Sequence, residues 1–182
     1  NNFQQIIRCN LAPINNFESF VGSKTTNRIC FSKILGKIKE KLPEEKNLTV
    51  SIPNYAIKKF RHYKGGAKKF KNNNPDYTIK ILGRKLIEEI FTNFNIKNPS
   101  AGFVSLYYFS EKFTKKIYYI GFDGYTTDKS HYYHILESSK RNDFHKKNAK
   151  NFHNIDEERI ILNKYISSGV INHLNNIYNN NV

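Results

Sequence analysis

The chain has 182 residues, of which 38% are hydrophobic, and this is enough for one domain with a real core but leaves little room for a second. The apolar residues are spread along the chain without a run long enough to span a bilayer, which predicts a soluble or at most peripheral protein. Thirty Lys and Arg against fifteen Asp and Glu give a net charge of +15, which favours nucleotides, nucleic acid, acidic lipids or phosphorylated glycans as partners without choosing among them.

Short apolar segments alternate with helical patterns, which predicts an α/β sheet covered by helices. In chain order, the expected strands are Gln4–Cys9, Arg28–Phe31, Leu48–Ile52, Tyr77–Leu82 and Lys116–Phe122. Amphipathic patterns predict helices over Leu86–Phe94 and Gly102–Phe113, and a last helix after His153.

The stretch from Lys58 to Lys71 concentrates basic residues around Gly65 and Gly66, which predicts an exposed basic loop. A solvated charge run explains it, but so does a surface that docks on acidic lipid headgroups or phosphorylated glycan. Aromatic and histidine side chains within it leave base stacking open as well: Phe60, His62, Tyr63 and Phe70.

Two short segments suit ligand binding at the ends of elements. Asn98–Gly102 precedes a helix, and the exposed N–H groups of a first helical turn bind phosphate or carboxylate, although an ordinary cap explains Pro99 and Ser100 too. Gly121–Gly124 follows a strand end, where glycine lets a backbone approach a ligand closely, although a tight turn is an equal explanation.

Two histidines are candidates for chemistry. His131 is followed by Tyr132 in a polar loop, where it either contacts a phosphate or belongs to an aromatic cluster by chance. His153 stands before the last helix, which carries Glu158, and a histidine there can take a proton from a hydroxyl at neutral pH. Taken alone, His153 is better explained as a surface residue, because six histidines are scattered along the chain.

Four segments carry a resemblance through their order and spacing: Arg8–Pro13 with Val21–Thr26, Pro99–Phe103 with Tyr119–Asp123, His131–Tyr133, and His153 with Glu158 after four intervening residues. They resemble, in turn, the long, small, third and very small sialyl motifs of the sialyltransferases, glycosyltransferase family 29. The resemblance runs from about Ile6 to Ile171, and four motifs in order are more specific than any one of them.

The resemblance implies a modified Rossmann-like fold, a variant similar to the GT-A fold, with a single sheet and helices on both faces. It implies one catalytic domain over residues 1–182 that lacks the family's first strand and Gly/Asn-rich nucleotide loop. The implied activity is metal-independent, cofactor-free, inverting transfer of sialic acid from CMP-sialic acid to a glycan hydroxyl.

The resemblance also implies roles for individual residues. Asn10 would hydrogen-bond the CMP, and Ser100 would hold the nucleotide with the backbone of Ala101 and Gly102. His131 would stabilise the leaving phosphate, His153 would be the general base, and Glu158 would orient that segment. Four further residues would bind substrate: Gly121, Phe122, Asp123 and Tyr132.

The chain departs from the family pattern at two places. Ala101 stands where a Thr is usual, and Ser110–Phe113 stands where animal members place a cysteine that pairs with the one at Cys9. Because that disulfide cannot form and Cys30 has no CxxC or Cys/His partner, no disulfide or zinc site is expected. We therefore expect a bacterial cytoplasmic enzyme at the inner membrane face, acting on lipooligosaccharide or capsule; a eukaryotic member would work in the Golgi lumen.

The sequence is also compatible with another donor and with another class of protein. The alternative donor is another CMP-ulosonic acid such as CMP-Kdo, which shares the anomeric carboxylate and the leaving group. A different class is a non-catalytic basic module on the same scaffold that binds nucleic acid or anionic glycan. We favour the enzyme, with peripheral contact to acidic membrane through Lys58 to Lys71 and no specific nucleic-acid partner.

Overall fold

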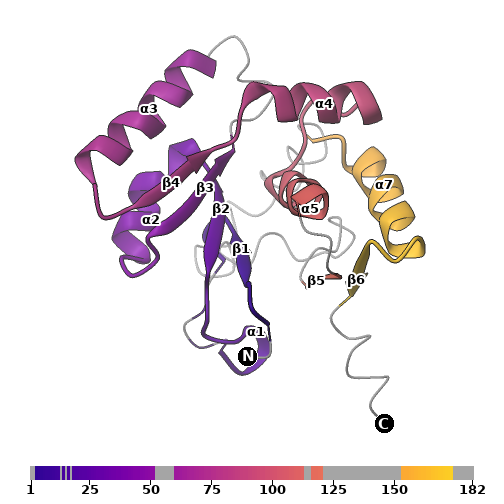
Figure 1. Ribbon diagram of the computed structural model, residues 1–182, viewed down its shortest axis with the longest axis horizontal. Coiled ribbons are helices and arrows are strands. Elements are labelled where there is room, and N and C mark those ends of the chain that lie inside the picture. Colours follow the sequence, from indigo (N-terminus) through magenta and orange to yellow (C-terminus); the bar gives the residue numbers. More distant parts are fainter. Residues whose placement is uncertain are drawn as a thin grey trace, which may run out of the picture.

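The computed structural model describes residues 3–12, 14, 16, 18–51, 60–112, 116–120 and 153–173, which form an α/β fold with helices on both faces of a parallel sheet (Figure 1). The elements are β1 (Ile7–Cys9), α1 (Glu18–Val21), β2 (Asn27–Phe31), a 3-10 turn (Ser32–Ile34), α2 (Leu35–Lys41), β3 (Asn47–Ser51), α3 (Phe60–Asn73), β4 (Thr78–Ile81), α4 (Arg84–Phe94), α5 (Ala101–Lys112), β5 (Ile117–Tyr119), α7 (Ile155–Ser167) and β6 (Ile171–His173). None of the helices in these ranges is long and apolar enough to cross a bilayer.

The main sheet has four parallel strands in the order β1-β2-β3-β4, with Ile29 of β2 opposite Cys9 of β1 and Thr49 of β3. This arrangement confirms the expected α/β class and agrees with a Rossmann-like fold. In the described residues, however, β5 pairs in parallel with β6 in a separate two-stranded sheet, where one sheet was expected. β6 has only three residues, which is too short to leave a periodic signal in the sequence.

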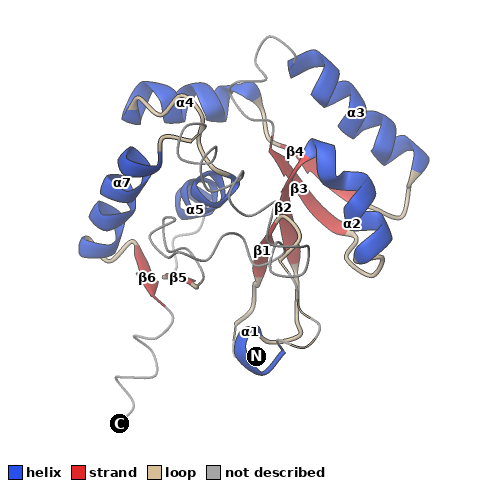
Figure 2. Cartoon of the chain, turned by 180° about the vertical axis from the view of Figure 1, so that it is seen from behind, coloured by secondary structure: helices blue, strands red, loops and turns tan. Residues whose placement is uncertain are grey.

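Alternate residues of the strands supply two cores, one on each face of the main sheet. Cys30 and Val50 point to one face and pack with Leu35 and Ile38 of α2 and with Ala67 of α3. The opposite face is covered by α4, α5 and α7, which Figure 2 shows gathered on one side of the sheet. The central strands β2 and β3 are therefore buried on both faces, whereas β4 exposes Thr78 and Lys80.

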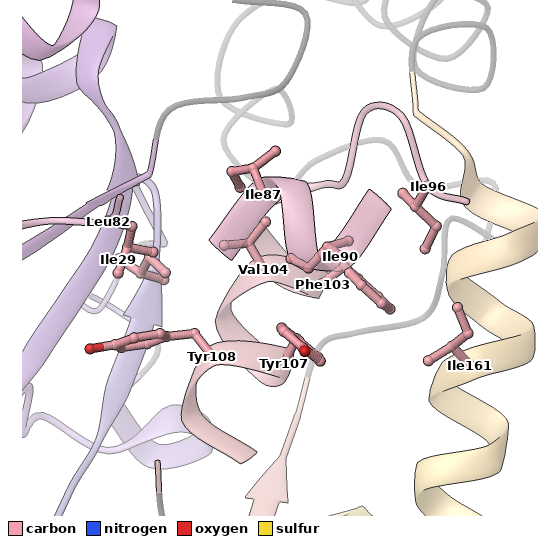
Figure 3. Close-up of a cluster of buried hydrophobic side chains, with 10 residues drawn as sticks. All are labelled: Ile29, Leu82, Ile87, Ile90, Ile96, Phe103, Val104, Tyr107, Tyr108 and Ile161. Carbon is pink, nitrogen blue, oxygen red and sulfur yellow. The ribbon is translucent and has the colours of Figure 1, made fainter. Parts of the chain in front are cut away.

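Helix α5 lies between the sheet and α7. Tyr108 points from α5 toward Ile29 and Leu82, whereas Ile96 and Ile161 lie on the opposite side of the helix (Figure 3). Six consecutive residues of α5, 103–108, are buried. The helix predicted over Gly102–Phe113 is confirmed, but its central part is not amphipathic, because a helix that is buried on all sides is apolar all round.

A buried ion pair fixes the chain that follows β1. The guanidinium of Arg28 is fully buried and donates two hydrogen bonds to the carboxylate of Glu45, one of them from Nη2 at 2.6 Å. The same guanidinium donates from Nη1 to the carbonyl of Asn10 at 2.6 Å and, more weakly, to that of Ala12. Because a guanidinium without partners is costly to bury, these bonds hold residues 10–12 against β2.

The prediction of an exposed basic loop over Lys58 to Lys71 was wrong, because α3 begins at Phe60 and continues through both central glycines. Tertiary packing explains the difference. Ala67 is fully buried, and the ring of Phe70 meets that of Tyr77 edge-on at 5.4 Å between centroids. Burial of this apolar stripe outweighs the low helix propensity of two glycines. Lys58 and Lys59 lie outside the described residues.

Candidate active site

The beginnings of α5 and α7 meet at one place. Ser100 immediately precedes α5, and its Oγ accepts the N–H of Phe103 at 3.1 Å while its carbonyl accepts that of Val104 at 2.9 Å. This is the geometry of a helix N-cap, which satisfies N–H groups that have no partner within the helix. Ser100 therefore sets where α5 starts.

Glu158, in the first turn of α7, binds this cap directly. One of its carboxylate oxygens accepts the backbone N–H of Ser100 at 2.6 Å, and the other accepts the hydroxyl of Ser100, also at 2.6 Å. The residue is only 5% exposed. Burial raises the pKa of Glu158 to about 7, against the opposing effect of the two bonds from Ser100. A buried carboxylate thus ties α7 to the start of α5.

His153 makes a second link between the same two segments. Its Nδ1 lies 2.9 Å from the carbonyl oxygen of Asn98. Because a carbonyl only accepts, Nδ1 carries the proton, and Nε2 is then the basic nitrogen of the neutral ring. Burial lowers the pKa of His153, although the bond to Asn98 acts in the opposite direction. The ring is therefore neutral at pH 7 and able to accept a proton at Nε2.

Asn154 supplies a third link, which the sequence analysis missed. Its side-chain Oδ1 accepts the backbone N–H groups of Lys97 at 3.0 Å and Asn98 at 3.3 Å. The only signal in the sequence was an asparagine just before a helix, which predicts an ordinary cap for that helix. A contact with residues more than fifty positions earlier in the chain cannot be inferred from such a signal.

The structure thus brings Ser100, Glu158 and His153 together, and it places Asn10 at the carboxyl end of β1. Asn10 has φ of 50°, a left-handed conformation that asparagine tolerates, and its Oδ1 accepts the N–H of Phe31 at 3.4 Å. The preceding Cys9 packs against the core cluster to which α5 contributes Val104 and Tyr108. The end of β1 therefore lies against α5, the helix that Ser100 caps.

Ala101 and Gly102 lie in the first turn of α5 and are half-buried. Beside them, the N–H and hydroxyl of Ser100 are already bonded to Glu158, so a carboxylate of the chain itself occupies part of the anion-binding helix start. The other residues assigned to the site lie outside the described part of the chain: Gly121, Phe122, Asp123, His131 and Tyr132. The roles of all these residues stay predictions.

Neither Cys9 nor Cys30 forms a disulfide in the structure. Burial raises the pKa of Cys9 to about 11 and that of Cys30 to about 12. Because the thiolate is the reactive form, both thiols are inert near neutral pH.

Within the ranges that the structure describes, no three His, Cys, Asp or Glu side chains lie close enough together to hold a metal ion. The metal-independent mechanism is not tested by this and stays a prediction.

Comparison with known families agrees with the motifs that meet at this junction. The chain matches Glycosyltransferase family 29 (sialyltransferase) over residues 1–170 of its 182. A search of curated proteins gave no match. Since the family match spans nearly the whole chain, including α5 and the start of α7, this protein belongs to glycosyltransferase family 29 and is a sialyltransferase-like glycosyltransferase.

Proposed function

We propose that the protein transfers sialic acid from CMP-sialic acid to a glycan hydroxyl with inversion of the anomeric centre, using His153 as general base and no metal ion. Family membership supports the transferase activity. The observation that carries the mechanism is the 2.9 Å contact between His153 Nδ1 and the carbonyl of Asn98, which leaves Nε2 as the basic nitrogen.

In the proposed step, Nε2 of His153 takes the proton of the acceptor hydroxyl as its oxygen attacks the anomeric carbon. The bond from that carbon to the phosphate oxygen of CMP breaks, and CMP leaves with the bonding electrons. The lowered pKa of His153 keeps the ring unprotonated before the step. Because the anomeric carbon is tertiary and can ionise early, the enzyme needs a base and a phosphate stabiliser but no Lewis acid.

The nucleotide is proposed to bind between the end of β1 and the start of α5. Asn10 would donate from its side-chain amide, and the first-turn N–H groups of Ala101 and Gly102 would face the CMP at the positive end of the helix. His131 would stabilise the phosphate as it departs. Glu158 does not contact substrate in this scheme but positions Ser100, to which it is bonded at 2.6 Å.

For the cellular setting, we propose the cytoplasmic face of a bacterial membrane and an acceptor such as lipooligosaccharide or capsule. Helix α3 supports contact with acidic lipid, because its lysines Lys64, Lys68, Lys69 and Lys71 are all exposed. These lysines therefore lie on a helix and not on the predicted loop, and the positive charge that they present is the same.

The test is a transfer assay with the purified protein. CMP-sialic acid and CMP-Kdo are offered in parallel with a panel of glycan acceptors, with and without EDTA, and released CMP and product mass are measured. We expect a sialylated product whose rate is unchanged by EDTA. Product from CMP-Kdo alone would contradict the donor assignment, and loss of turnover in EDTA would contradict the metal-free mechanism.

A further inference from the structure

We infer that Asn154 is the positioning residue of the general base: its side chain holds the backbone at Lys97 and Asn98 so that the Asn98 carbonyl fixes the orientation and tautomer of His153. This inference rests on the proposed role of His153.

Asn154 occupies the N-cap position of α7, where an asparagine side chain usually accepts an N–H group of its own helix. Here the side chain makes no such cap bond. Its Oδ1 instead accepts the N–H groups of Lys97 at 3.0 Å and Asn98 at 3.3 Å, across more than fifty residues of sequence. The helix therefore gives up an ordinary cap so that the side chain can reach the segment before α5.

The two bonds close a small circuit. Asn98 donates its N–H to Asn154 and presents its carbonyl to Nδ1 of His153, the residue next to Asn154 in the chain. Asn98 is thus held at its N–H by Asn154 and at its carbonyl by His153, the two residues that precede α7. If the Asn154 side chain were removed, the imidazole would keep its hydrogen-bond acceptor but that acceptor would lose its anchor.

The following residues show why a side chain is needed at this point. Pro99 has no N–H group, so the backbone there cannot be held by a donor of its own. Ser100 is anchored by Glu158 at 2.6 Å. The peptide that carries the Asn98 carbonyl therefore lies between two anchors, Asn154 on one side and Glu158 on the other, and Asn154 bonds to the N–H of Asn98 itself.

This arrangement predicts a specific kinetic effect. When the Asn98 carbonyl is not fixed, part of the His153 population has its proton on Nε2 or its ring turned away, and neither form accepts a proton from the acceptor. We expect kcat to fall by about tenfold to a hundredfold, which is typical for a misplaced reacting group. The KM for the CMP-sugar should change little, because Asn154 does not belong to the nucleotide site.

The experiment compares Asn154→Ala with two other variants of the enzyme. Asn154→Asp keeps an oxygen that accepts both N–H groups, so its turnover should stay close to that of the wild type. Asn163→Ala makes the same chemical change at an exposed position of the same helix and should behave as the wild type. Besides kcat and KM, the ring nitrogens of His153 are assigned by 15N NMR, where the wild type should show its proton on Nδ1 and Asn154→Ala should lose that preference.

Each outcome decides between the claims. Wild-type kcat and tautomer in Asn154→Ala, with His153→Ala inactive, would overturn the positioning role and leave the base in place. Activity in His153→Ala would overturn the proposed function instead. If Asn154→Ala does not fold, Asn154→Gln, which displaces the amide oxygen by one methylene, must show the loss of kcat. A proton on Nε2 in the wild-type protein would overturn the inference whatever the rates.

Discussion

Replacing His153 with alanine is expected to lower the transfer rate by about three orders of magnitude while CMP binding is largely retained, in line with the usual size of a general-base contribution. The half-buried ring is held at Nδ1 by the Asn98 carbonyl, and its lowered pKa keeps it neutral. Both features suit a group that must take a proton at neutral pH. The measurement is kcat/KM for transfer alongside the Kd for CMP.

His145 is the matched control, because it is the other histidine between the third motif and α7, although it lies outside the described residues. His145 is followed after four intervening residues by Lys150, whereas His153 has Glu158 at that spacing. His145→Ala should therefore change the rate little. If His145→Ala were the slower of the two folded variants, the assignment of the base would be wrong.

The variant Glu158→Gln is expected to remove a large part of the pH dependence of stability. In the folded protein the pKa of Glu158 is raised from 4.5 to about 7. The folded state therefore holds a proton that the unfolded state releases between these values, and stability falls as the pH rises through this window. From the size of the shift, this group alone accounts for a loss of about 3 kcal/mol between pH 4 and pH 8.

Glutamine keeps both contacts with Ser100, since its carbonyl accepts the backbone N–H and its amide donates to the hydroxyl oxygen, but it does not ionise. The free energy of unfolding, measured in urea at several pH values, should therefore decline less from pH 5 to pH 8 in Glu158→Gln than in the wild type. Glu40→Gln, at an exposed position of α2, is the control and should follow the wild type. Parallel curves for wild type and Glu158→Gln would show that the carboxylate is not buried as described.

The sequence predicted the main sheet well because each strand carries apolar residues that pack in one or both of the cores beside the sheet. β2 spans Asn27–Phe31 where Arg28–Phe31 was expected, and β4 spans Thr78–Ile81 where Tyr77–Leu82 was expected. Helix α3 was missed because paired glycines and a run of lysines favour a loop locally, whereas the burial of Ala67 depends on a sheet that no local pattern reveals.

For the candidate site, the sequence supplied the residues but not their contacts. The resemblance assigned Ser100 to the nucleotide and Glu158 to orienting a segment, and the structure joins the two directly across 58 residues. A hydrogen bond between distant helix starts leaves no periodic trace in a sequence. The role of Asn154 was hidden for the same reason, because before a helix an asparagine looks like an ordinary cap.

The central claim is a single displacement in which His153 takes the proton of the acceptor hydroxyl while the hydroxyl oxygen attacks the anomeric carbon. It is tested most directly by the anomeric configuration of the glycoside formed from CMP-sialic acid, determined by 1H NMR. We predict the configuration opposite to that of the donor. A product that retains the donor's configuration would exclude attack from the face opposite the leaving CMP and would contradict the account.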